Sequence, residues 1–232
     1  MGIAYNTSIV RDGLVLHLDA ANRKSYPGSG TAWNDLSGNG NNGTLVNGPT
    51  YGSSNNGLLT FDGVDDYVNI SNAAIGNFGT SNFTVSCWGK AASGSTGTRG
   101  IFSKYNPHSA SGTGWFLFYR DGNIWARITQ DLVAPLEASS ISVNIGTNVW
   151  YLFTMVRSGN SFLLYANDTL LQTNTTTNLI DCSSNAPLRI GSGYVSGYYY
   201  SGDCSGASIY NRELTATEVR QNFNAIRGRY GV

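Results

Sequence analysis

Apolar and polar residues alternate along short segments of the chain, which is the pattern of β-strands with one buried face. Residues 14–19 alternate strictly, so Leu14, Leu16 and Leu18 are expected on one face and His17 on the solvent side. Gly, Asn and Ser dominate residues 22 to 56, where a long loop is expected. Further strands are expected at residues 58–61, 67–70, 83–88, 150–156, 162–166, 188–190 and 205–210. This succession predicts an all-β fold built as a two-sheet antiparallel sandwich.

The clearest hairpin is centred on Asp121-Gly122, a dipeptide that favours a two-residue type I′ turn. The register that this turn imposes places three pairs on the core face: Trp115 with Ile128, Leu117 with Ala126, and Tyr119 with Ile124. The opposite face pairs Phe116 with Arg127 and Phe118 with Trp125. Because that second face mixes aromatic side chains with arginine, it is a ligand-facing surface, a partner-facing surface, or one covered by a loop.

One short helix is expected near the end of the sequence. Thr215 and Glu218 have the spacing of a capping box, in which each side chain bonds the backbone amide of the other. An apolar stripe follows at Val219, Phe223 and Ile226, and Gly228 suits the helix stop. No linker, repeat or change of composition divides the chain, so residues 1–232 are predicted to form a single domain.

The composition limits the classes of partner. Only 12% of the 232 residues are charged and the net charge is zero, so there is no basic stripe to bind nucleic acid. No apolar stretch approaches the length of a membrane span, and the first residues lack the pattern of a signal peptide. Zero net charge favours association. We therefore expect a homo-oligomer or repeated copies, with a neutral, turn-rich surface as the alternative.

The chain has three cysteines, Cys87, Cys182 and Cys204. Their odd number and wide spacing match neither a disulfide framework nor a zinc site. Cys87 and Cys204 are expected to be small buried residues. A disulfide bond between Cys182 and Cys204 is the alternative that the sequence leaves open.

Several segments together resemble the laminin G-like members of the concanavalin A-like lectin/glucanase superfamily. They are residues 13–20, 35–44, 61–68, 150–151 and 209–215 with the helix that follows. The resemblance implies a concanavalin A-like jelly roll. The opening at residues 13–22 and 26–30 and the closing at residues 224–231 resemble a subset found among structural proteins of tailed phages, which implies a virion protein made in the host cytoplasm.

Catalysis is not expected. The glucanases that the chain resembles use a Glu-x-Asp-x-x-Glu strand, and no such sequence occurs here. Two of the three glutamates, Glu213 and Glu218, belong to the helix entry, and Glu137 lies in a segment that looks like a loop. Asp65 and Asp66 are interpreted as turn and strand-edge residues that point to opposite faces. His17 and His108 have no nucleophile at a motif spacing.

The resemblance also implies candidate sites. Many relatives hold a structural calcium ion, and Asp203 and Asp19, with the loop at residues 37–43, occupy the matching positions. The alternative is that Asp203 stabilises a turn and no cofactor is bound. A glycan would dock on aromatic planes beside Arg or Asn. The candidates for such a site are Trp125 with Arg127, Tyr105 in the segment 104–108, and the run Tyr198-Tyr199-Tyr200, from which Tyr199 is chosen. The competing interpretation is that these aromatic side chains only cover sheet surfaces or protein contacts.

Taken together, the sequence predicts a non-enzymatic virion structural protein, either a capsid decoration or a fibre or tail component. Its expected partners are other virion proteins, with a cell-surface glycan as a further ligand. The alternative function is a carbohydrate-binding, lectin-like module for cell attachment, and a glycoside hydrolase ranks third.

Overall fold

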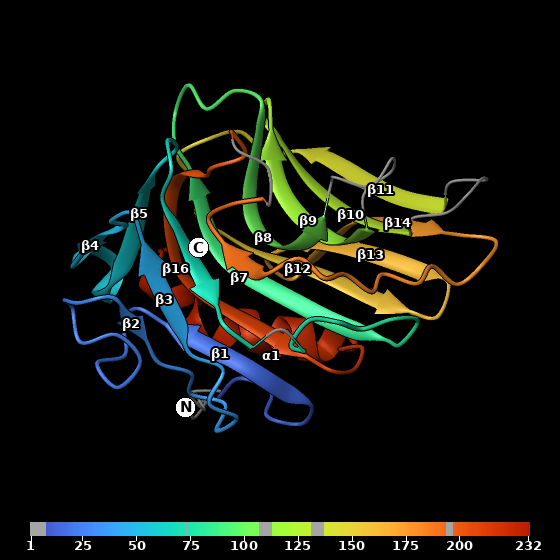
Figure 1. The fold of residues 1–232 in the computed structure, drawn as a ribbon, viewed down its shortest axis with the longest axis horizontal. Coiled ribbons are helices and arrows are strands. Elements are labelled where there is room, and N and C mark those ends of the chain that lie inside the picture. The colour runs from blue at the N-terminus through green and yellow to red at the C-terminus, as the bar shows by residue number, and fades with distance from the viewer. Residues whose placement is uncertain (1–7, 73, 107–112, 131–136, 194–196) are drawn as a thin grey trace, which may run out of the picture.

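The computed structural model describes residues 8–72, 74–106, 113–130, 137–193 and 197–232, of which 137–140 are described by their backbone alone. Two antiparallel sheets of eight strands each pack face to face (Figure 1). Sheet A contains β1 (Leu14–Asp19), β4 (Thr50–Gly52), β5 (Leu58–Asp62), β7 (Phe83–Ala91), β12 (Tyr151–Ser158), β13 (Ser161–Ala166), β14 (Thr169–Thr175) and β16 (Ser201–Tyr210). Sheet B contains β2 (Ala32–Trp33), β3 (Gly43–Val46), β6 (Tyr67–Ile70), β8 (Thr98–Asn106), β9 (Thr113–Arg120), β10 (Asn123–Gln130), β11 (Glu137–Asn144) and β15 (Leu188–Ile190). The predicted jelly-roll sandwich is confirmed.

The main core lies between the inner faces of the two sheets. Trp115 from β9 is fully buried there, edge-on to Phe102 of β8 and near Phe83 of β7. The three inward pairs expected from the hairpin register all belong to this core. Burial of large aromatic and branched side chains on both inner faces supplies the main favourable free energy of folding.

Helix α1 (Ala216–Ile226) covers the outer face of sheet A, on the side away from sheet B (Figure 1). Phe223 of α1 stacks on Trp88 of β7, with ring centroids 5.9 Å apart. Tyr230, just beyond the 3₁₀ turn Arg227–Arg229, stacks on the same indole at 4.2 Å. A second 3₁₀ turn, Ser54–Asn56, precedes β5. The middle of the outer face of sheet A, around Trp88, is therefore covered by this chain itself, whereas β14 at the edge of the sheet is mostly exposed.

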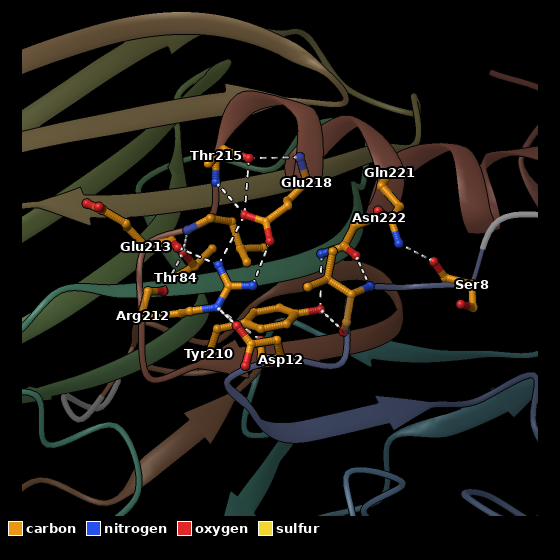
Figure 2. A network of polar contacts seen from close by, with 12 residues as sticks. Ser8, Asp12, Thr84, Tyr210, Arg212, Glu213, Thr215, Glu218, Gln221 and Asn222 are labelled. Atoms are coloured by element: carbon orange, nitrogen blue, oxygen red, sulfur yellow. Dashed lines mark hydrogen bonds and ion pairs between the residues drawn. The ribbon is translucent and has the colours of Figure 1, made fainter.

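A polar network fixes the start of α1 (Figure 2). The capping box between Thr215 and Glu218 is present as predicted. Arg212 adds a second tie, because its Nη2 lies 2.6 Å from Glu218 Oε1 and its Nε lies 2.8 Å from an oxygen of Asp12. Asn222 donates a hydrogen bond to Tyr210 Oη, which links the helix to β16.

Five sequence expectations about local structure are wrong. A register shift between Leu14 and Leu16 breaks the alternation of β1, so Leu14 packs in a cluster with Val219 outside the main core. His17 does lie on the outer face, but it is only 8% exposed, because α1 and the loop around Asp35 cover that face. The expected loop at 22–56 contains β2, β3 and β4, and Glu137 begins β11. Gly228 lies inside the 3₁₀ turn, and the helix ends at Ile226.

Within the part of the chain that the structure describes, no helix combines the length and apolar character needed to cross a membrane.

Candidate binding surface

The hairpin of β9 and β10 builds the candidate surface. Asp121 and Gly122 have φ angles of 50° and 86°, and positive values at both central positions define the type I′ turn. The observed pairs are those predicted, including Phe118 with Trp125 and Phe116 with Arg127 on the outer face. A two-residue turn therefore determines which side chains meet on the outer face of sheet B.

Five aromatic side chains on this face form a continuous cluster, which we call the aromatic face: Tyr105, Phe116, Phe118, Trp125 and Tyr198. Tyr105 stacks on Phe116 at 5.3 Å, and Phe116 stacks on Phe118 at 4.5 Å. Trp125 extends the stack from Phe118 at 5.7 Å, and Tyr198 lies 6.2 Å from Phe116. All four contacts are close to parallel stacking.

Exposure divides the aromatic face into a base and a rim. Tyr105, Phe116 and Phe118 are 7%, 2% and 6% exposed, so they form a buried base. Trp125 and Tyr198 are partly exposed. Trp125 is the one tryptophan of the five that is not buried, because Trp33, Trp88, Trp115 and Trp150 are all at most 7% exposed. A ligand on this face would therefore touch Trp125 and Tyr198 first.

Arg127 lies on the same face, two residues after Trp125 on β10. Its guanidinium carbon lies 6.0 Å from the centre of the Tyr105 ring, within the range of a cation–π contact. Burial raises the pKa of Tyr105, and the charge of Arg127 opposes part of that rise. Two inaccessible donors on β10, Arg127 Nε and Trp125 Nε1, have no hydrogen-bond partner among the described residues.

Of the sequence candidates, Tyr105, Trp125 and Arg127 are brought together, with Tyr105 on β8 and not in the expected loop. Tyr199 makes no ring contact with the aromatic face among the described residues. Its backbone bridges Ser192 and its carbonyl accepts a hydrogen bond from Arg99. Tyr198, in the same candidate run, does join the aromatic face. The chain crosses here from sheet B to β16 of sheet A, so strand alternation does not determine which tyrosine of the run faces outward. His108 lies outside the described residues.

The two residues expected to bind calcium, Asp19 and Asp203, each form an ion pair with a cation of this chain. Asp19 forms a bidentate ion pair with Arg229, whose Nη1 and Nη2 lie 2.7 and 3.0 Å from the two carboxylate oxygens. Asp203 lies 2.7 Å from Lys90 Nζ and accepts a hydrogen bond from Thr60. A calcium ion bound by these two carboxylates would therefore compete with Arg229 and Lys90. Calcium binding stays a prediction, and thermal melting with calcium and with a chelator tests it.

A different group of carboxylates lies close together at the turn before β6. Oxygens of Asp62, Asp65 and Asp66 lie within 4.8 Å of one another. Asp62 accepts the amide of Val64, and Asp66 accepts the amide of Asp62, so the turn role predicted for this segment is confirmed. The expectation of opposite faces is wrong, since Asp65 and Asp66 precede the strand. Burial raises the pKa of Asp66.

The glutamates near the helix have structural partners. Glu213 accepts a hydrogen bond from Asn82, and Glu218 is held by Thr215 and Arg212. The side chain of Glu137 lies outside the described part. No pair of carboxylates among the described side chains of the aromatic face offers the acid and nucleophile that a retaining glycosidase requires.

Two hollows of about 410 and 660 Å³ lie away from the aromatic face and share Asn211. The smaller one is lined by several amides, including Asn77 and Asn211, above the partly buried Phe78. Their volumes fall in the range of ligand pockets, but they are wide and shallow. They are the rival location for a ligand.

Comparison with solved structures shows the fold. The binding domain of Paraclostridial mosquitocidal protein 1 is similar with a TM-score of 0.71 and 19% identity, over 93% of this chain and 52% of that one. The binding domain of botulinum neurotoxin DC in complex with rat synaptotagmin II gives 0.71 and 14%, over 94% and 52%. The same toxin's binding domain in complex with SialylT gives 0.70 and 13%, over 93% and 52%. The present chain spans about half the length of these chains.

A search among curated protein sequences found no match. A family model described as the concanavalin A-like lectin/glucanases superfamily, of the laminin G type, matches residues 62–220, which is more than half of the chain. The match includes β7 to β16, and so the whole of the aromatic face. The chain belongs to the concanavalin A-like lectin/glucanases superfamily.

Proposed function

We propose that this domain is a non-catalytic recognition domain that binds a glycan on the aromatic face of sheet B. The observation that carries the proposal is the asymmetry of the sandwich. Helix α1 and Tyr230 cover the aromatic side chains in the middle of the outer face of sheet A, whereas Trp125, Tyr198 and Arg127 remain partly exposed on the outer face of sheet B. The aromatic cluster on sheet A thus has its partner within the chain, and the aromatic face of sheet B has partly exposed rings that a ligand can contact.

The residue types suit a saccharide. Aromatic rings offer flat apolar surfaces for the C–H faces of a sugar ring. Arg127 adds charged donors beside Trp125. The buried base of Tyr105, Phe116 and Phe118 holds the rim in position before a ligand arrives, which lowers the entropic cost of binding.

The structures similar in fold support recognition as a role. Binding domains of botulinum neurotoxin DC were solved with rat synaptotagmin II and with SialylT, a protein and a glycan ligand. Identities of 13% and 14% limit this support to the fold. The choice of a glycan, and of this face, rests on the exposed side chains of the present chain.

A glycan array followed by calorimetry on the best ligand tests the proposal. We expect Trp125→Ala and Tyr198→Ala each to weaken binding by about tenfold or more, because each removes a stacking plane. Tyr199→Ala is the matched control, a partly exposed tyrosine next to Tyr198 that lies outside the aromatic face. Absence of binding to any glycan contradicts the proposal. Binding that is lost in Asn77→Ala but kept in Trp125→Ala places the site in the rival hollow.

A second candidate is a virion structural protein that acts through contacts with capsid or tail proteins. It is supported by the resemblance of the opening and closing segments to tailed-phage proteins and by a charged fraction of only 12%. In this case the partly exposed aromatic side chains would contact a protein or another copy of the chain. Mass spectrometry of purified particles, with the copy number of this chain relative to the capsid and tail proteins, tests that role and the virion location. A discrete stoichiometry supports it, and absence of the chain from particles contradicts it.

A further inference from the structure

The charges on the outer face of sheet B are not balanced. One row across the sheet runs through Arg127 of β10, Phe116 of β9, Ser103 of β8 and Arg189 of β15, as the strand register shows. Among the described side chains that β3, β6, β8, β9, β10 and β15 direct outward, none is acidic. The chain as a whole has zero net charge. Positive charge is therefore concentrated on this surface and compensated elsewhere.

Arg127 differs from the other arginines of this region in its partners. Arg120, at the hairpin end, lies 3.7 Å from Asp121, and Arg189 stacks on Tyr67 at 4.3 Å. Arg127 has no carboxylate partner within the described residues, and its Nε is inaccessible without a hydrogen bond. A cation held partly out of water against an aromatic ring gains more from an opposite charge than an exposed one does.

The unpartnered groups on β10 are all donors. A guanidinium and an indole N–H can donate hydrogen bonds but cannot accept them. Trp125 Nε1 and Arg127 Nε belong to residues two apart on one strand, so both side chains are directed to the same face. Both of these atoms are inaccessible, so a ligand contacts the partly exposed remainder of the Arg127 side chain. A group that only accepts hydrogen bonds and carries negative charge suits that cation, as a carboxylate or a sulfate does.

We infer that the glycan bound by the aromatic face carries an anionic group, a carboxylate or a sulfate, and that Arg127 is the residue that selects it. The inference rests on the proposed function and adds the ligand class and its selecting residue. In this arrangement Trp125 and Tyr198 hold the sugar rings, and the guanidinium of Arg127 pairs with the anion. Arg127 then determines specificity, and the aromatic rim provides affinity for any sugar.

The test compares three probes by calorimetry: sialyllactose for a carboxylate, a heparin-derived hexasaccharide for sulfate, and lactose as the neutral reference. We expect at least one acidic probe to bind the wild-type chain about tenfold more tightly than lactose, and more weakly at high salt. Arg127→Gln is expected to remove this preference, so that the acidic probes and lactose bind the variant with similar affinity. Arg127→Lys keeps the charge but not the planar fork, and is expected to retain part of the preference. Arg120→Gln, an outward arginine on the adjacent strand, is the matched control and is expected to leave both affinities unchanged.

The outcomes separate this inference from the proposed function. Equal affinity for acidic and neutral probes, or a preference that survives in Arg127→Gln, overturns the inference, while loss of all binding in Trp125→Ala would still support the proposed function. No binding of any probe to the wild-type chain overturns both. Thermal melting of each variant shows whether a lost affinity reflects a lost fold. If Arg127→Gln is unstable, a reduced preference for the acidic probes in Arg127→Lys tests the same inference.

Discussion

The indole ring of Trp125 stacks on the ring of Phe118 across β9 and β10, with centroids 5.7 Å apart and planes 12° apart. The two residues are directly paired in the hairpin register. That register is fixed at Asp121-Gly122, only a few residues away, where both φ angles are positive. A local turn thus sets the geometry of the surface that we propose to bind the ligand.

Gly122→Ala is expected to destabilise the chain by about 1 to 2 kcal/mol, because Gly122 has a φ of 86° and a Cβ there would lie 3.2 Å from Asn144 Nδ2. Urea denaturation measures the loss. Gly228→Ala is the control, since a Cβ at Gly228 meets nothing within 4 Å and its φ is not positive. Equal stability of the two variants would contradict this account of the turn.

The start of α1 is expected to weaken in acid. Hydrogen bonds from Arg212 and Thr215 lower the pKa of Glu218 to about 2, from its ordinary value of 4.5. A carboxyl whose pKa is lower in the folded state stabilises the fold above its unfolded pKa, and this contribution is lost as the pH falls from about 4.5 to about 2.

Glu218→Gln is therefore expected to lower the free energy of unfolding by about 1 kcal/mol at neutral pH and by almost nothing near pH 2. The value at neutral pH is small because Glu218 and Arg212 are both partly exposed. Urea titrations of both proteins across this pH range measure the difference. A constant difference at all pH values would show that ionisation of Glu218 is not the cause.

His17 gives a second pH dependence in a different range. Burial under the loop and the end of the chain lowers its pKa below the ordinary 6.5, opposed by Asp19 and Asp35, while Arg11 and Arg229 add to the lowering. A histidine whose folded pKa is lowered contributes full stability above 6.5, and this contribution falls as the pH drops below that value, because the unfolded chain takes up the proton first.

His17→Gln is expected to flatten the stability curve of the chain just below pH 6.5, as followed by thermal melting. In the native chain, His17 Nδ1 lies 2.9 Å from Ser208 Oγ, so the variant also loses this hydrogen bond at neutral pH. A variant curve parallel to that of the wild type in this range would rule out His17 as the titrating group.

The cysteines are expected to be unreactive in the folded chain. All three are buried, and burial raises the pKa of Cys182 to about 11. The pKa of Cys87 is raised well above its ordinary value, first by its hydrogen bond with Cys204 and then by burial. The sulfur atoms of Cys204 and Cys87 lie 3.4 Å apart. The cysteine beside Cys204 is therefore Cys87, and not Cys182, for which the sequence had left a disulfide bond with Cys204 open.

A thiol reagent such as dithionitrobenzoate should therefore label no cysteine at pH 8 in native protein, and all three after denaturation, because only the exposed thiolate reacts. Rapid labelling of any cysteine in the native chain would contradict the predicted burial.

The sequence was sufficient for elements that carry a strong local pattern. The hairpin register follows from Asp121-Gly122, and the helix start follows from Thr215 and Glu218. Residues 67–70 and 188–190 also coincide with β6 and β15. In each of these segments, turn chemistry or alternation of side chains alone fixes the structure.

Elements that lack an apolar pattern of their own were missed. The strand β14 is polar and mostly exposed, so it lacks an apolar pattern and forms because β13 offers hydrogen bonds. Strands β2 to β4 lie in a Gly- and Asn-rich stretch for the same reason. The site was predicted in part: Tyr105, Trp125 and Arg127 share a face, but the choice between Tyr198 and Tyr199 depends on where the chain crosses between sheets.

The central claim is that a ligand contacts Trp125 on the aromatic face. Of the five indole N–H groups, only that of Trp125 belongs to a tryptophan that is not buried, and its signal can be assigned by its absence in Trp125→Phe. In ¹⁵N-resolved NMR spectra recorded while sialyllactose is added, the account predicts that the Trp125 signal shifts to saturation and the other four stay in place. A titration in which the Trp125 signal does not move, although the ligand binds, would contradict it.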